Sequence, residues 1–172
     1  MTDQIAPPPA PTAPWVVVKF GGTSVSTRVR WKNIRRIAAS HSARGRRVVI
    51  VVSALSGITD RLKAIAEARN EEARRAVRDE IVARHEAMLA ELEVPRAVLD
   101  ARLAELDRLI ADPRRTRGDV GWQAEVYALG ELMSSALGAA FLSSGDDALP
   151  TAWLDARDFL RAESLPNQNA WG

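Results

Sequence analysis

The feature that most constrains the fold is a strand, a small-residue turn and a helix in succession, a pattern that occurs twice early in the chain. Residues 15–20, WVVVKF, are an apolar run that stops at Gly21-Gly22, and residues 48–52, VVIVV, are a second run that stops at the turn 53–57. Such runs predict buried strands, and the glycines predict tight turns after them. The two units therefore predict a parallel sheet in an α/β fold, with residues 48–52 covered on both faces.

The rest of the chain is expected to be mostly helical. Thr23, Ser24 and Ser26 offer N-cap oxygens for a helix over about 27–44. Apolar stripes with helical spacing predict further helices, followed by a third strand and one short helical turn. The first of these helices starts at about Ile58, two helical stripes cover Val77–Leu92 and Leu99–Ile110, and the last helix spans about 122–144. The strand covers about 149–154, and the short helical turn covers 156–161.

Composition narrows the chemistry. The chain has 172 residues, no cysteine and two histidines, so disulfides, Cys-ligated metals and thiol catalysis are excluded and a His-built metal site is disfavoured. Both histidines, His41 and His85, lie in charged helical stretches and are expected at the surface. A net charge of +2 gives no sign of a nucleic-acid partner.

No targeting signal is expected in the first residues of the sequence. Residues 1–14 are rich in proline, which predicts a disordered tail, and they lack the basic start and apolar stretch of a secretory signal. No apolar run approaches the roughly 20 residues that a membrane span needs. We therefore expect a cytoplasmic protein with no membrane partner.

The first candidate site is the segment Lys19-Phe20-Gly21-Gly22-Thr23-Ser24 at a strand-to-helix junction. Glycine amides, a helix N-terminus and a lysine together suit an oxyanion, so phosphate binding is one interpretation. The spacing matches neither the Walker pattern nor the dinucleotide pattern. The alternative is a plain glycine turn beside a lysine whose ammonium reaches solvent.

Two more candidates involve hydroxyl and carboxylate groups. Ser53 and Thr59 flank the end of the second strand and could bind a carboxylate, since ligands of open α/β sheets gather at the carboxyl ends of strands. The alternative is that Thr59 or Ser56 only caps the next helix. Gly130-Glu131 interrupts an apolar helix, which suggests that something packs or binds there; otherwise Glu131 lies on the solvated helix edge.

Four segments together resemble the N-terminal part of the aspartate kinases, a branch of the amino acid kinase superfamily. They are VVVKFGGTSV (16–25), VVSALSGITD (51–60), GELMSS (130–135) and AWLDARDFL (152–160). The resemblance implies a three-layer parallel-sheet sandwich of the amino acid kinase type. It also implies phosphorylation of the L-aspartate side-chain carboxylate by Mg-ATP, within lysine, threonine and methionine biosynthesis.

The resemblance assigns roles to the candidates residue by residue. Lys19 matches the lysine that contacts the transferring phosphate, and the segment 20–24 matches the phosphate loop beside it. Ser53, Thr59 and Glu131 match positions that line the aspartate site. No metal ligand is expected from the protein, because Mg²⁺ is held mainly by the phosphates. The parent family is expected to form homo-oligomers.

The resemblance also implies parts that these 172 residues lack, namely a later glycine-rich segment, the adenine site and ACT domains. Residues 15–172 are thus expected to be the N-terminal lobe of an incomplete kinase domain, inactive in isolation. One alternative is a non-catalytic assembly or regulatory subunit that docks on a complete kinase. Another is a different member of the same superfamily, although an N-acylated substrate would not need an acid at Glu131.

Overall fold

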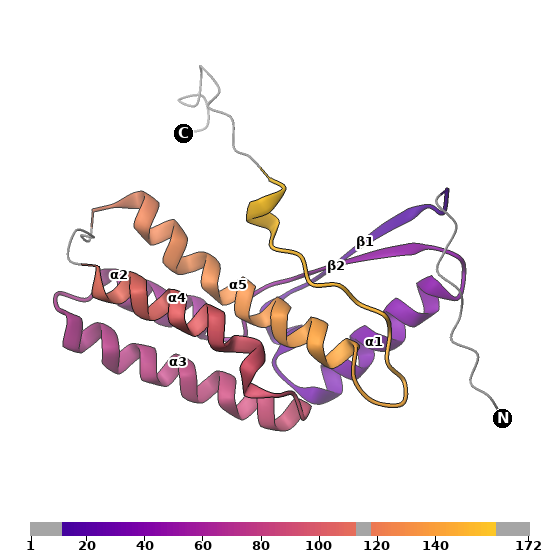
Figure 1. Cartoon of the computed structure of the whole chain (residues 1–172), viewed down its shortest axis with the longest axis horizontal. Helices are drawn as coiled ribbons and strands as arrows, with labels where there is room; N and C mark the ends of the chain where they lie inside the picture. Colours follow the sequence, from indigo (N-terminus) through magenta and orange to yellow (C-terminus); the bar gives the residue numbers. More distant parts are fainter. Residues whose placement is uncertain (1–11, 113–117, 161–172) are drawn as a thin grey trace, which may run out of the picture.

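The computed structural model describes residues 12–112 and 118–160, and Figure 1 shows their arrangement. The main elements are β1 (Trp15–Phe20), α1 (Arg28–Ser42), β2 (Arg47–Val52), α2 (Ile58–Glu67), α3 (Glu71–Leu92), α4 (Asp100–Ala111) and α5 (Val120–Leu142). Short 3-10 helices cover Gly22–Val25 (η1), Arg96–Leu99 (η2) and Ala156–Asp158 (η3). The expected α/β class is confirmed. Most of the expected Pro-rich tail, residues 1–11, lies outside the described residues.

The sheet consists of β1 and β2, which pair in parallel with Trp15 opposite Arg47 and Phe20 opposite Val52. Helix α1 connects the two strands, as parallel pairing requires. One face of the sheet packs against the core through Phe20, Ile50 and Val52. On the other face Val17 is 65% exposed and Val51 is 40% exposed. The expectation that residues 48–52 are covered on both faces is therefore met on one face only.

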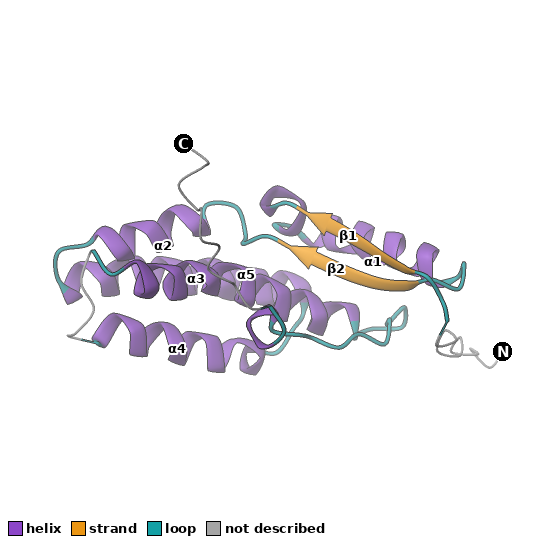
Figure 2. Cartoon of the chain, turned by 90° about the horizontal axis from the view of Figure 1, so that it is seen from above, coloured by secondary structure: helices purple, strands orange, loops and turns teal. Residues whose placement is uncertain are grey.

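Helices α2 to α5 pack together beside the sheet. Contacts join α2 to α3 and α5, and α4 to α3 and α5, while α1 and α5 both touch β2. Figure 2 shows these four helices on one side of the molecule and the sheet with α1 on the other. Helix α5 thus connects the two parts. None of the helices in the described ranges is long and apolar enough to cross a membrane.

The start of α1 differs from the expectation. Thr27 is the N-cap residue, and its side-chain oxygen accepts from the Arg30 amide at 3.4 Å. Residues Gly22–Val25 instead form η1. Thr23, Ser24 and Ser26 were expected to supply the cap, which is wrong because η1 takes up Gly22–Val25 and Ser26 is the residue that ends it. A helix cap accepts from an amide two or three residues ahead, so only Thr27 is at the right place.

The expected strand over 149–154 is not formed. The sheet contains only β1 and β2 among the described residues, and the hydrogen bonds of this segment go to α5 and to the residues just after α5. The Leu149 amide donates to the Leu142 carbonyl at 2.7 Å, and the Trp153 indole donates to Ser135 Oγ at 2.9 Å. Pro150 has no amide for a ladder. The expected helical turn that follows is present as η3.

His85 is buried, although it was expected at the surface. Its side chain is inaccessible on α3, and Nδ1 lies 2.8 Å from the Ile81 carbonyl oxygen. Nε2 is buried with no hydrogen-bond partner in the described structure. Burial lowers the pKa of His85 below its usual value of 6.5. The imidazole is therefore held neutral, with Nδ1–H as the donor.

A His85→Met variant should lose less stability than the parent chain when the pH falls from 7.5 to 5. Below pH 6.5 His85 binds a proton in the unfolded chain but not in the folded chain. The free energy of unfolding therefore decreases by up to about 1.4 kcal/mol for each pH unit that the pH falls. Urea unfolding at several pH values measures this slope. His41→Gln controls for the loss of a histidine elsewhere. Equal slopes for the parent and His85→Met would contradict the assignment.

Candidate functional site

Lys19 lies at the end of the strand β1, next to the first glycine turn. It faces Val51 across the sheet, and its side chain is exposed. Among the described residues it has no hydrogen bond or ion pair. Gly21 precedes η1 and is exposed, with nothing within 4 Å of the place where a Cβ would stand. The lysine ammonium is therefore free to meet an anion, and the exposed Gly21 leaves room beside it.

The turn after β1, residues 21–26, lies directly against the turn after β2, residues 53–57; these are called the first turn and the second turn. The Ser53 amide donates to the Phe20 carbonyl at 3.0 Å, which continues the sheet ladder beyond both strands. A Cβ on Gly22 would stand 2.7 Å from the Ala54 carbonyl oxygen, closer than real Cβ atoms approach. Gly22 is thus required for this contact. The two carboxyl ends of the strands meet at one place, as the parallel arrangement predicts.

The second turn leads into α2 through Gly57, which has a φ of 82°. This left-handed conformation favours glycine. Gly57 is the N-cap residue and offers no side-chain cap, so the alternative that Ser56 or Thr59 caps α2 is wrong. Thr59 is exposed in the first turn of α2, and Ser53 is half-buried. Among the described residues, neither hydroxyl has a hydrogen-bond partner.

Glu131 reaches the second turn from α5. Its Oε1 accepts from the Ala54 amide at 3.4 Å, while the side chain stays exposed. Gly130 explains this approach, because a Cβ there would stand 2.8 Å from the Ala54 Cβ and 3.0 Å from Leu62 Cδ1. The glycine in mid-helix is thus a packing requirement. We call residues 19–26, 53–59 and 130–131 the two-turn site.

Three arginines bind the carbonyl oxygens of the two turns. Arg30 donates to the Thr23 carbonyl. Arg61 Nη1 donates to the Gly57 carbonyl at 3.1 Å, and Arg84 Nη2 donates to the Ser26 carbonyl at 3.2 Å. Sequence reasoning missed them, since Arg84 lies on α3, 58 residues beyond its partner. They add positive charge beside the two-turn site, which favours anionic ligands.

Acidic groups at the two-turn site are few. Glu131 is one, and Asp60 is exposed in the first turn of α2. Within residues 12–112 and 118–160, no group of three or more His, Cys, Asp or Glu side chains is placed to hold a metal ion. The protein side chains of the site therefore suit an organic or phosphoryl anion better than a directly bound cation.

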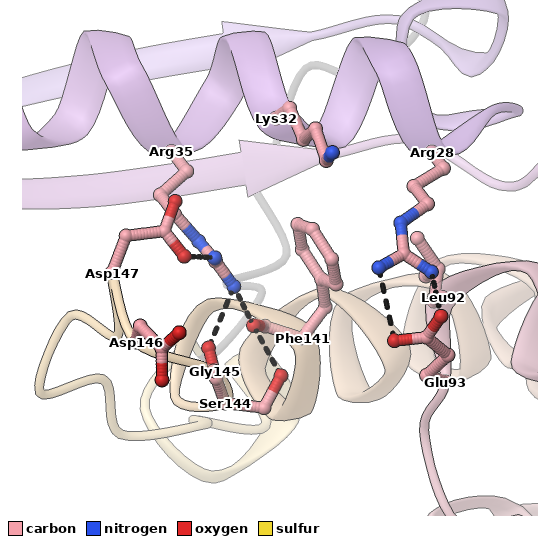
Figure 3. A pocket seen from close by; sticks show the side chains of 10 residues that line it. All are labelled: Arg28, Lys32, Arg35, Leu92, Glu93, Phe141, Ser144, Gly145, Asp146 and Asp147. Carbon is pink, nitrogen blue, oxygen red and sulfur yellow. Dashed lines mark hydrogen bonds and ion pairs between the residues drawn. The ribbon is translucent and has the colours of Figure 1, made fainter.

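A separate hollow of about 540 Å³ lies between α1 and the C-terminal ends of α3 and α5. Figure 3 shows Arg28 and Arg35 reaching across it from α1. Arg28 pairs with Glu93 at 2.7 Å and lowers the pKa of that carboxyl through its hydrogen bond. Arg35 is buried and binds Asp147 and the Phe141 carbonyl. These paired arginines fasten α1 to its neighbours, and no residue of the two-turn site lines the hollow.

A Gly130→Ala variant should be less stable than a Gly121→Ala variant by about 1–3 kcal/mol, the usual cost of overpacking. Both changes replace glycine in α5, and both gain helix propensity. At Gly121 a Cβ would meet only Asp119 Oδ1, at 3.4 Å, whereas at Gly130 it would displace Ala54. Urea unfolding measures the difference. Equal stabilities would show that α5 does not press against the second turn.

The chain is similar to known proteins of one family. The Amino acid kinase family profile matches residues 14–170. An aspartokinase from Rickettsia bellii (strain RML369-C) is 47% identical over 47 residues, which are 27% of this chain and 12% of that protein. The aligned segment is thus short but closely similar.

Two crystal structures of E. coli aspartokinase III are similar in fold. The complex with aspartate and ADP (R-state) has a TM-score of 0.61 at 28% identity, and the complex with lysine and aspartate (T-state) has 0.59 at 29%. Each match covers 75% of this chain and 28% of aspartokinase III, so the chain spans less than a third of these relatives. The profile match over almost the whole chain establishes that the protein belongs to the amino acid kinase family.

Proposed function

We propose that this chain supplies the amino-acid-binding part of an aspartate kinase. The reaction is transfer of the γ-phosphoryl group of ATP to the side-chain carboxylate of L-aspartate, which gives aspartyl phosphate for lysine, threonine and methionine biosynthesis. One observation carries the proposal: a lysine, two turns rich in glycine and hydroxyl groups, and a carboxylate meet at the two-turn site. The aspartokinase relatives support the choice of substrate.

The chemistry requires no general base. An aspartate side chain has a reference pKa of about 3.9 and is ionised at neutral pH. Phosphoryl transfer then depends on in-line positioning and on neutralising charge between two anions. In the proposal, Lys19 and the amides of Gly21 and Gly22 contact the transferring phosphoryl group, together with Phe20, Thr23 and Ser24 of the same loop. Mg²⁺, held mainly by the phosphates, supplies further positive charge when bound.

The amino acid itself meets the other two segments. Ser53 and Thr59 carry hydroxyls with no hydrogen-bond partner in the described structure and would donate to substrate carboxylates. Glu131 would bind the α-ammonium group, because a carboxylate is the natural counter-charge for it. It contacts the Ala54 amide only at 3.4 Å, so an ammonium group is a better partner than the one it has.

Calorimetric titration of L-aspartate into the 172-residue chain tests the proposal. Glu131→Gln should weaken L-aspartate binding by about tenfold or more, the usual range for a lost charged hydrogen bond. N-acetyl-L-aspartate, which lacks the ammonium group, should bind weakly to the parent and be unaffected by the variant. Lys19→Ala should weaken Mg-ATP binding.

The matched controls are Glu67→Gln and Lys32→Ala, which alter exposed groups of the same kinds elsewhere. Phosphoryl transfer is assayed separately from binding, because the chain matches only 28% of the length of aspartokinase III. The proposal would be rejected if the folded parent chain bound neither L-aspartate nor Mg-ATP. Equal binding of L-aspartate and N-acetyl-L-aspartate would favour another member of the superfamily.

A second candidate, a non-catalytic subunit that docks on a complete aspartokinase, is favoured by the exposed sheet face. Trp15, Val17, Val49 and Val51 form an apolar patch on that face, and Trp15 is 58% exposed. Size-exclusion chromatography with a full-length aspartokinase should then give a complex that Val17→Arg disrupts. Val29→Arg, at an equally exposed valine on α1, is the control. Independent elution of the two proteins would reject this candidate.

A further inference from the structure

Ser26 joins the two turns of the two-turn site. It follows η1, and its hydroxyl donates to the Gly22 carbonyl oxygen at 2.6 Å while accepting from the Ser56 amide at 2.9 Å. In the part of the chain that the structure describes, no other hydrogen bond links residues 21–26 to residues 53–57. We call this pair of hydrogen bonds the Ser26 bridge.

The Ser26 bridge acts together with a steric contact. A Cβ on Gly22 would stand 2.7 Å from the Ala54 carbonyl oxygen, so only glycine at this position allows the two turns to lie this close. The Ser26 bridge opposes their separation, because without it the Ser56 amide would lose its partner. The Phe20–Ser53 backbone hydrogen bond holds the two turns where the strands end, and the Ser26 bridge adds a second link at Ser56.

Ser26 is also fixed from outside the site. The Arg84 guanidinium on α3 binds its carbonyl oxygen, and the next residue, Thr27, caps α1. The Ser26 backbone is therefore held between α3 and the start of α1. By contrast, the hydroxyls of Thr23 and Ser24 have no partner among the described residues and remain available to a ligand.

We propose that Ser26 is a positioning residue, which sets the spacing between the phosphate-facing amides of Gly21-Gly22 and the hydroxyls of Ser53 and Thr59. An amino acid that accepts a phosphoryl group has to meet both turns at once, so a fixed spacing presents it with a pre-formed geometry. The role in ligand binding rests on the proposed function, whereas the link between the turns does not.

The test compares Ser26→Ala with Ser26→Thr, which keeps a hydroxyl, and with Ser40→Ala, which removes an exposed serine hydroxyl from α1. Amide hydrogen exchange by NMR is the first measurement. In Ser26→Ala the Ser56 amide should exchange about tenfold faster than in the parent chain, while Leu106 in α4 is unchanged. Ser26→Thr should restore protection, and Ser40→Ala should match the parent.

Calorimetric titration of L-aspartate is the second measurement. The dissociation constant should rise about threefold to tenfold in Ser26→Ala, the range expected for one net hydrogen bond, and return toward the parent value in Ser26→Thr. Ser40→Ala should bind as the parent does. In the proposal Ser26 does not touch the ligand, so a change in L-aspartate affinity would reflect a change in the spacing between the two turns.

Four results would overturn the proposal. Unchanged exchange at Ser56 would show that the Ser26 bridge does not hold the turns, and faster exchange throughout the chain, including Leu106, would show a general loss of structure. Unchanged L-aspartate affinity despite faster exchange at Ser56 would remove the positioning role. A parent chain that binds neither L-aspartate nor Mg-ATP overturns the proposed function and this positioning role, while the exchange result still judges the link between the turns.

Discussion

The close packing around Ala54 is the constraint on which the candidate site depends. A Cβ on Gly22 would stand 2.7 Å from the Ala54 carbonyl oxygen, a Cβ on Gly130 would stand 2.8 Å from the Ala54 methyl group, and the Ala54 amide donates to Glu131. The first two of these approaches require glycine, at Gly22 and at Gly130. The two turns and α5 can therefore meet only with this sequence pattern, and their meeting brings Lys19, the hydroxyl groups and Glu131 into one region.

The packed helices support this arrangement. Helix α5 contacts α2 and α4 over one part of its length and the strand β2 over another. Arg35, which is buried, binds backbone carbonyls at the end of α5 and holds α1 there. Arg84 on α3 links that helix to the first turn in the same way, by donating to the Ser26 carbonyl oxygen. The sheet provides the site with its two turns, and the helices fix how those turns face Glu131.

The sequence predicts the local features well because their signals are local. The strands at 15–20 and 48–52 are marked by apolar runs, and the turns after them by small residues. The Gly130-Glu131 pair indicates a packing or binding role, and Gly130 does pack against Ala54. The substrate-binding roles of Lys19, Ser53, Thr59 and Glu131 stay predictions.

Features that depend on distant partners are not predicted. Ser26 looks like a helix cap in sequence, but it bonds Ser56, 30 residues away. The segment 149–154 has the composition of a strand, yet α5 and its end take its hydrogen bonds. His85 follows Ile81 by four residues and precedes Met88 by three, so the helical stripe that marks the core also contained a signal for its burial.

The most direct test of the central claim, that the two turns and α5 form one ligand site, is to map L-aspartate binding on the ¹⁵N-labelled chain by NMR. We predict that shifts in backbone amide resonances concentrate at residues 19–26, 53–59 and 130–131 and saturate with a single affinity. Shifts centred instead on the hollow beside Arg35 and Phe141, or different affinities for the two turns, would contradict it.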